Sequence, residues 1–273
     1  MGTVVLGVLA TLLTSWLLKA PGQVFDTDAV EDGLRSGPDS SVSAEVVRMD
    51  DEGLSAITRD EFRPNAAQEQ MLERRGSVNT AAFGRLMRAY HAVSPEVVTV
   101  RATVTGRRNQ KIDIEDIRPL ITARTAPLSG SYLNVPPQGA PSTLNMLFDM
   151  DRPFPIARNV DVDAFCADGG QQKALGPPFF GQRTITLQDK EQQVLLIRAI
   201  TTEHYVAFRL EVDYMLGNEK KKAVIDDHGK PFEVSALNLT PDGKLGYHSV
   251  YELQSDFSLR RVKRWGAATG IGC

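Results

Sequence analysis

Alternation of apolar and polar residues dominates the middle and the last third of the chain, and this period of two predicts short β-strands. The clearest runs are a nearly continuous apolar stretch at 194–200 and an alternating one at 206–214. Gly- and Pro-containing turns separate the runs, and no long helical pattern interrupts them. The chain is therefore predicted to be mainly β, with an antiparallel β-sandwich that is immunoglobulin-like in general architecture. Other predicted strands are 98–104, 112–123, 143–149, 184–188 and 220–225.

The runs at 194–200 and 206–214 are predicted to be adjacent antiparallel strands at the centre of the sandwich. A continuous apolar run is typical of a strand buried on both faces. In the second run Val206, Phe208 and Leu210 share one face with two further apolar residues, and the opposite face is largely polar. Truncating Leu196 or Phe208 is therefore expected to be costly, and truncating Glu211 is not.

The apolar period changes to that of a helix between 65 and 93, which predicts one or two short amphipathic helices broken near Gly76. Before it, residues 20–64 are acidic and rich in Asp, Ser and Gly, and they are interpreted as a linker with one candidate strand at 42–49. A loop is predicted at 127–142. The predicted β-domain thus covers 65–255, and a basic, then glycine-rich tail covers 256–273.

The first 18 residues, Met1 to Leu18, carry no charged side chain, and Lys19 ends the run. As a helix this run would be roughly 27 Å long, against a hydrocarbon core of about 30 Å. We therefore expect a single transmembrane anchor at 1–19. The alternative, a cleaved secretory signal, lacks a basic segment before the apolar run and a clear small-residue cleavage site.

The segment that follows the anchor is poor in Lys and Arg, so it lacks the mark of a cytoplasmic flank. We therefore expect the carboxyl-terminal domain to be extracytoplasmic and the protein to lie in the cell membrane. In that oxidising compartment Cys166 and Cys273, the two cysteines of the chain, can form a disulfide. The formal net charge of −3 argues against nucleic acid as a partner.

Three stretches carry a family resemblance: VTVRATVTGRRNQKIDIEDIRPLI, FDMDRPFPIA and VIDDHGKPFEVS. With the anchor, they resemble uncharacterised actinobacterial proteins in which one hydrophobic helix precedes an extracytoplasmic all-β domain. The similarity covers roughly 85–240 and concerns strand and turn patterns. It implies fold and topology, and no ligand or reaction. Relatives often have a cysteine near Gly130-Ser131-Tyr132, where this chain has none.

The candidate chemistry is sparse. Alternating acids at Asp161 and Asp163, with Asp168 nearby, could offer oxygen ligands to Ca²⁺, but acidic surface loops are common and a solvated loop is the preferred interpretation. Asp226-Asp227-His228-Gly229 has the composition of a hairpin turn. The basic cluster 260–265 could contact anionic lipids or wall polymers, or be a solvated tail. No catalytic motif, metal-ligand spacing or cofactor-binding motif is recognised.

The sequence therefore predicts a membrane-anchored module of the cell envelope that binds an envelope protein or wall polymer, or supports a neighbour, without being an enzyme. The alternative is an envelope hydrolase in which the fold brings together acids drawn from a dispersed set. That set is Asp149, Asp151, Asp161 and Asp163.

Overall fold

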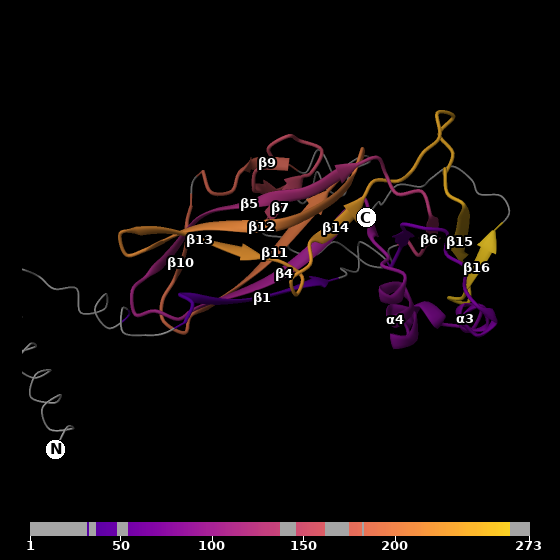
Figure 1. Ribbon diagram of the computed structural model, residues 1–273, viewed down its shortest axis with the longest axis horizontal. Coiled ribbons are helices and arrows are strands. Elements are labelled where there is room, and N and C mark those ends of the chain that lie inside the picture. Colours follow the sequence, from indigo (N-terminus) through magenta and orange to yellow (C-terminus); the bar gives the residue numbers. More distant parts are fainter. Residues whose placement is uncertain are drawn as a thin grey trace, which may run out of the picture.

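The computed structural model describes residues 32, 37–47, 54–136, 146–161, 175–181 and 183–262. Within them the chain is mainly β, with two six-stranded sheets, one four-stranded sheet and two α-helices. Figure 1 shows an elongated molecule, with the large sheets at one end and the small sheet with both helices at the other. The elements are β1 (Ser40–Val47), β2 (Ala56–Thr58), α3 (Ala66–Leu72), η1 (Ser77–Asn79), α4 (Ala81–Ala89), β3 (Ser94–Pro95), β4 (Val97–Gly106), β5 (Ile112–Thr125), β6 (Ser131–Asn134), β7 (Met146–Asp149), β8 (Arg158–Val160), β9 (Leu175–Pro178), β10 (Ile185–Leu187), β11 (Gln192–Ile200), β12 (Tyr205–Leu216), β13 (Glu219–Ile225), β14 (Phe232–Ser235), β15 (Ser249–Leu253) and β16 (Leu259–Val262).

The two large sheets pack face to face and form the sandwich lobe. One sheet has the order β1-β4-β11-β7-β8-β9, and the other has the order β10-β5-β12-β14-β3, with β13 also paired to β12. Alternate residues of each strand point inward, so their apolar side chains share one core. On β12 the inward set is the one that the alternation predicted: Val206, Phe208, Leu210, Val212 and Tyr214.

The prediction that 194–200 and 206–214 are adjacent antiparallel strands is wrong. β11 pairs with β4 and β7, whereas β12 pairs with β5, β13 and β14 in the other sheet. Leu195 and Ile197 of β11 instead belong to the same buried core as Phe208 of β12, from the opposite sheet. The chain crosses from one sheet to the other between the two strands. Burial of β11 on both faces is also incomplete, because Val194 is 45% exposed.

The sandwich is not purely antiparallel, which corrects a second expectation. β7 runs parallel to β11, and β3 runs parallel to β14. Most of the long ladders are antiparallel, including the β12–β13 hairpin that turns at Gly217, where φ is 56°. Pro119 lies within β5, where the strand on the other side, β10, pairs only with Ile112–Ile114. A missing amide donor is therefore tolerated at that edge.

The small lobe consists of the sheet β16-β15-β6-β2 and the two helices, which share an apolar cluster with it. This lobe contains stretches that were predicted to be irregular. Residues 54–64 of the predicted linker include β2, whose three residues are buried, and the predicted loop at 127–142 includes β6. The start of the predicted tail contains β16. These strands are short and pair with distant partners, so local composition did not reveal them.

The strand proposed at 42–49 is present as β1, which pairs with β4 along its whole length. The chain just before it is fixed to the end of the sandwich through Asp39. Its carboxylate accepts bonds from Arg108 Nε at 2.8 Å, Lys221 Nζ at 3.0 Å and the Tyr214 hydroxyl at 3.0 Å. The segment leading into β1 is thus part of the folded lobe.

Among the helices in the described residues, none is long and apolar enough to cross a bilayer. The predicted anchor, Met1–Leu18, lies outside the described residues, as do Cys166 and Cys273 of the predicted disulfide.

Candidate functional site: the groove between the lobes

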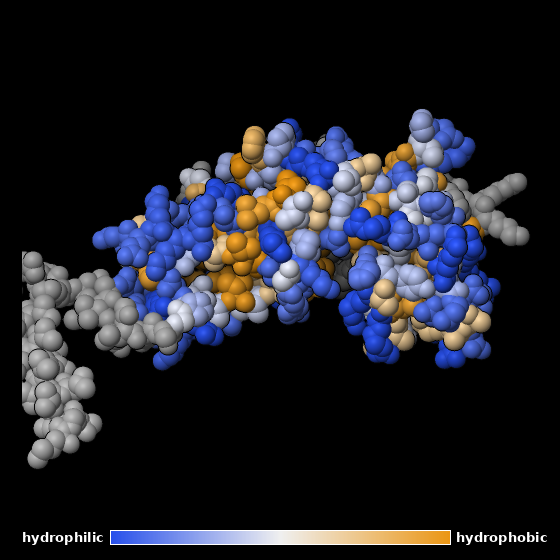
Figure 2. All heavy atoms as spheres, in the orientation of Figure 1, coloured by the Kyte–Doolittle hydropathy of each residue, from blue (hydrophilic) through white to orange (hydrophobic). Residues whose placement is uncertain are grey.

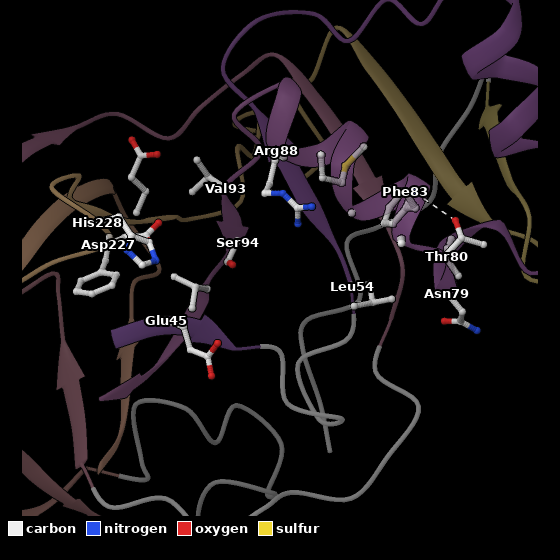
Figure 3. A pocket seen from close by; sticks show the side chains of 18 of the residues that line it. Glu45, Leu54, Asn79, Thr80, Phe83, Arg88, Val93, Ser94, Asp227 and His228 are labelled. Carbon is white, nitrogen blue, oxygen red and sulfur yellow. Dashed lines mark hydrogen bonds between the residues drawn. The ribbon is translucent and has the colours of Figure 1, made fainter. Parts of the chain in front are cut away.

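A hollow of about 1030 Å³ separates the sandwich lobe from the small lobe, and we call it the interlobe groove. Figure 3 shows side chains from both lobes pointing into it. One wall is α4 with the turn before it, and the other is formed by the end of β1 and the turn between β13 and β14. The residues used below are Glu45, Val46, Leu54, Asn79, Thr80, Phe83, Gly84, Met87, Arg88, Val93, Asp227, His228 and Glu233.

The helical wall is set by the start of α4. Thr80 is the N-cap residue, and its hydroxyl oxygen accepts a hydrogen bond from Phe83 N at 3.2 Å, which satisfies one of the free amides of the first turn (Figure 3). Phe83 and Met87, one turn apart, are buried and form the apolar base of this wall. Gly84 also lines the groove, and a Cβ added to it would lie 3.6 Å from Arg88 Nη1.

The opposite wall depends on a tight turn. Asp226 Oδ1 accepts a hydrogen bond from Gly229 N at 2.8 Å, and His228 and Gly229 both have positive φ, 52° and 87°. This geometry holds Asp227 and His228 at the groove, as Figure 3 shows. The sequence interpretation of 226–229 as a turn is thus correct, and the turn also presents two polar side chains to the groove.

Charges of opposite sign face the groove from its two walls. Arg88 projects from α4, while Asp227 and His228 lie on the sandwich wall (Figure 3). Within the described part of the chain, these three side chains form no ion pair or hydrogen bond with another residue. Glu45, by contrast, pairs with Arg101 at 3.2 Å. The unpaired groups are therefore available to a ligand that carries charge of both signs.

Arg59, Tyr205 and Glu233 join the lobes beside the groove, and we call them the interlobe latch. Arg59 Nη2 donates to the Tyr205 hydroxyl at 2.9 Å, and its guanidinium lies 4.8 Å from the centre of the Tyr205 ring. Tyr205 in turn donates to Glu233, which also pairs with Arg59 at 3.4 Å. Burial, followed by the bond to Glu233, raises the pKa of Tyr205. The phenol therefore remains a donor at neutral pH.

Backbone bonds and an apolar cluster also fix the lobes to each other. Ile57 and Val93 exchange two backbone hydrogen bonds, both of 2.8 Å. The apolar cluster around them contains Tyr205 and Ala207 of β12 and Tyr132 of β6, whose ring stacks on that of Tyr247 with the ring centroids 5.4 Å apart. The groove is thus bounded by two lobes held in a fixed relation.

The acids of the hydrolase hypothesis are partly brought together at another end of the sandwich. Asp151 accepts bonds from Thr201 Oγ1 at 2.6 Å and Thr202 N at 2.7 Å, and it lies 3.0 Å from His204 Nδ1. Burial alone would raise the pKa of Asp151, but these bonds outweigh it and lower the pKa. Asp149 is similarly engaged, by Asp151 N at 3.1 Å. We call this network the Asp151 clamp.

The Asp151 clamp holds the crossing between β11 and β12, and its bonds occupy the carboxylate oxygens that a catalytic acid or base would use. A hollow of about 590 Å³ near it is lined by Asp149 and Arg152, which pair at 2.9 Å, and not by Asp151 or His204. Of the other predicted acids, Asp161 follows β8 and Asp163 lies outside the described residues. In the described ranges, no group of three His, Cys, Asp or Glu side chains could hold a metal ion.

Sequence reasoning did not identify the groove. Its residues come from segments that were predicted to be a linker, a helix pair and a hairpin turn, and only the fold brings them together. The other candidates are separate from it: His248 bonds to Ser129 O at 2.8 Å, and Arg261 of the basic cluster pairs with Glu61 at 3.4 Å. The amphipathic period of 81–89 was the one local signal, because it left Arg88 on the polar face.

Comparison with known proteins gives no further assignment. No protein-family model matches the sequence, and no curated protein matches it.

Proposed function

We propose that the protein is a membrane-anchored, extracytoplasmic binding module of the cell envelope, and that its ligand occupies the interlobe groove. The observation that carries this proposal is the pair of unpartnered, oppositely charged side chains on the two walls, Arg88 and Asp227, with the imidazole of His228 beside Asp227. The anchor is the apolar run Met1–Leu18. Two packed β-sheets support an immunoglobulin-like sandwich in general architecture, with the parallel β7–β11 pair as a departure from it.

The chemistry of the walls favours a peptide segment of an envelope protein as the ligand. The rims offer charge to side chains of either sign, while the apolar residues beneath them, Phe83, Met87 and Val93, are buried and only close the floor of the groove. A wall polysaccharide is less well matched, because sugar rings pack on exposed aromatic faces. The two aromatic residues that line the groove, Phe83 and Phe232, are only 4% and 1% exposed.

The proposal is tested by cross-linking in membranes that contain the full chain with a photoreactive residue in place of Asn79. We expect a cross-linked envelope protein, and we expect Arg88→Glu to abolish it because the helical wall then repels the acidic groups of the ligand. Gly84→Leu should also abolish it, by filling the groove while favouring the helix. The matched control is Arg85→Glu, an equal charge change on the exposed side of the same helix.

Loss of the cross-link in Arg88→Glu and Gly84→Leu, with retention in Arg85→Glu, supports the groove as the binding site. Equal cross-linking in all four proteins would refute it. Digestion of the captured species distinguishes the ligand classes, since a polysaccharide would be resistant to protease.

A hydrolase remains the second candidate, and one observation speaks for it: the carboxylate of Asp151 lies 3.0 Å from His204 Nδ1, and the Asp151 amide bonds to a second carboxylate, Asp149. Their oxygens are occupied by donors of the surrounding loop, whereas a general base must be able to reach a substrate proton. The binding module is therefore better supported.

A further inference from the structure

The outer strand of one large sheet, β1, has a free edge. β1 is the first strand in its sheet and pairs only with β4 among the strands that the structure describes. Figure 1 shows it along the lower border of the sandwich. Its sequence, SSVSAEVV, has one charged residue and no proline. The devices that usually protect an edge strand are therefore nearly missing, in contrast to β13, which carries three consecutive lysines.

The direction of the free backbone groups follows from the bonds at the start of the β1–β4 ladder. Arg107 N donates to Asp39 O at 2.9 Å, so these two residues form a hydrogen-bonded pair. The next residue of β4, Gly106, directs both of its groups to the other side: its N–H donates to Glu191 O and its carbonyl accepts from Lys190 N, both at 3.0 Å. Pairs with and without hydrogen bonds alternate along an antiparallel ladder.

The odd-numbered residues of β1 therefore bond to β4, and the even-numbered ones present N–H and C=O at the free edge. Those residues are Ser40, Val42, Ala44 and Val46. Their side chains lie on the core side of the sheet, where Val42 and Ala44 pack against the sandwich core and Val46 is 40% exposed. Figure 2 shows apolar atoms gathered on this side of the molecule, between β12 and β1.

β1 is complementary to itself in one antiparallel register. If Ala44 lies opposite Ala44 of a second copy, Val42 lies opposite Val46, and the outward backbone groups of both strands meet in about six hydrogen bonds. All paired residues then keep the same face, as a twofold axis through the sheet requires. On the outer face Ser43 lies opposite Glu45, so the one charge of the strand meets a hydroxyl and not its own copy.

We propose that the protein forms a twofold-symmetric dimer through edge-to-edge pairing of β1, in the register that centres on Ala44. The occupant of the edge is a second copy of this chain, because both the backbone groups and the single charge fit that register. The dimer would extend each six-stranded sheet into one continuous sheet of two copies. Glu45 and Val46 also border the interlobe groove, so the second copy would lie at one rim of it.

The register makes a charge test possible at Ser43, which is exposed in the monomer. Sedimentation of the full chain in a mild detergent, at concentrations up to about 500 µM, should show a monomer–dimer equilibrium typical of a small interface. Ser43→Glu places two acids opposite Glu45 of the partner copies and should raise the dissociation constant about tenfold. Ser43→Lys should lower it by a similar factor. The double variant S43E/E45K should lower it as Ser43→Lys does, because each glutamate then lies opposite a lysine of the partner copy.

The matched control is Thr103→Glu, which adds the same charge to β4, opposite Ser43 and one strand away from the edge. It should leave the dissociation constant within about threefold of the original. Opposite effects of Ser43→Glu and Ser43→Lys, with rescue in the double variant, support the pairing. A chain that stays monomeric throughout, or a dimer that responds to none of the Ser43 changes, would overturn it.

Discussion

The hydroxyl of Tyr214 donates a 3.0 Å hydrogen bond to Asp39 Oδ2, and it thereby joins the carboxyl-terminal end of β12 to the segment that leads into β1. The same carboxylate accepts from Arg108 and Lys221. Burial alone would raise the pKa of Asp39, but these three bonds outweigh it and lower the pKa below 3.8. Burial and the carboxylate together raise the pKa of Tyr214 to about 12.

Asp39→Asn should therefore lower the free energy of unfolding by about 2–3 kcal/mol at pH 7, because Arg108, 8% exposed, loses its charged partner. A group with a lowered pKa contributes stability above its unfolded value and loses it as the pH falls through the folded value. The difference between wild type and variant should therefore shrink below about pH 4. Chemical denaturation at several pH values measures this difference in the free energy of unfolding. A difference that stays constant down to pH 2 would contradict the role of Asp39.

The contribution of Tyr214 to stability has the opposite pH dependence, because it is lost at alkaline pH. Its raised pKa means that its contribution is fully present below the ordinary value of 10.0 and is lost as the pH rises toward about 12. Tyr214→Phe should remove this loss of stability at alkaline pH. It should not change the loss at acid pH that depends on Asp39. Denaturation between pH 9 and pH 11 is the measurement.

The core of the sandwich predicts a clear order of truncation costs. Phe208→Ala should cost about 3–5 kcal/mol and Leu195→Ala about 2–5 kcal/mol, because both side chains are buried in the shared core. Leu196→Ala should cost less than Leu195→Ala, since Leu196 is on the outer face of the sheet. Glu211→Ala should have a far smaller effect, because Glu211 pairs with Arg118 and Lys222 at the surface. Thermal melts of the four variants establish the order, and equal losses at 195 and 196 would refute the face assignment.

The sequence was a good guide to strands and faces and a poor guide to partners. Alternation identified β4, β5 and β12 and the inward face of β12, because a period of two depends only on local burial. Alternation could not show whether β11 and β12 form a hairpin, since a short connection also fits a crossing between sheets. The connection is held by the Asp151 clamp, and Asp151 lies 50 residues before Thr201, so no local pattern reveals this contact.

The small lobe and the groove were beyond local inference for a related reason. β2 has three residues, and β6 lies among prolines and glycines, so neither gives a periodic signal. Each is stabilised by a distant strand: Ser131 of β6 lies opposite Ser249 of β15, and their hydroxyls bond at 2.6 Å. The groove exists only once this lobe stands against the sandwich.

The interlobe latch should control the local stability of the joint. Tyr205→Phe removes the hydroxyl that links Arg59 and Glu233, and we expect a loss of about 1 kcal/mol with the ring stacking retained. Hydrogen exchange of the Ile57 and Val93 amides, which bond across the joint, should accelerate in this variant. Exchange in the centre of β12 should not change. Acceleration throughout the molecule would mean that the latch affects global stability and not the joint.

The proposed topology predicts accessibility from outside the cell. Protease added to intact cells should digest the two lobes and spare cytosolic markers if, as proposed, the anchor crosses the membrane once and the carboxyl-terminal domain lies outside. Replacing Ala20 with a run of three Arg residues, directly after the anchor, should retain that flank in the cytoplasm and protect the lobes. Protection of the lobes in the unmodified protein would contradict the proposed orientation.

The Asp151 clamp distinguishes a structural from a catalytic role for the acid–histidine pair. Asp151→Asn keeps the size of the side chain but turns one acceptor into a donor opposite Thr201, Thr202 and His204, so we expect a loss of about 1–3 kcal/mol. His204→Ala should cost less, because the ring is 31% exposed and supplies only one of the donors.

Since the pKa of Asp151 is lowered, the loss of stability in Asp151→Asn should diminish as the pH falls below 3.8. Calorimetry at pH 3 and pH 7 tests this order. Unchanged stability in Asp151→Asn would mean that the carboxylate is not needed to hold the β11–β12 crossing, and the case for a catalytic pair would then be stronger.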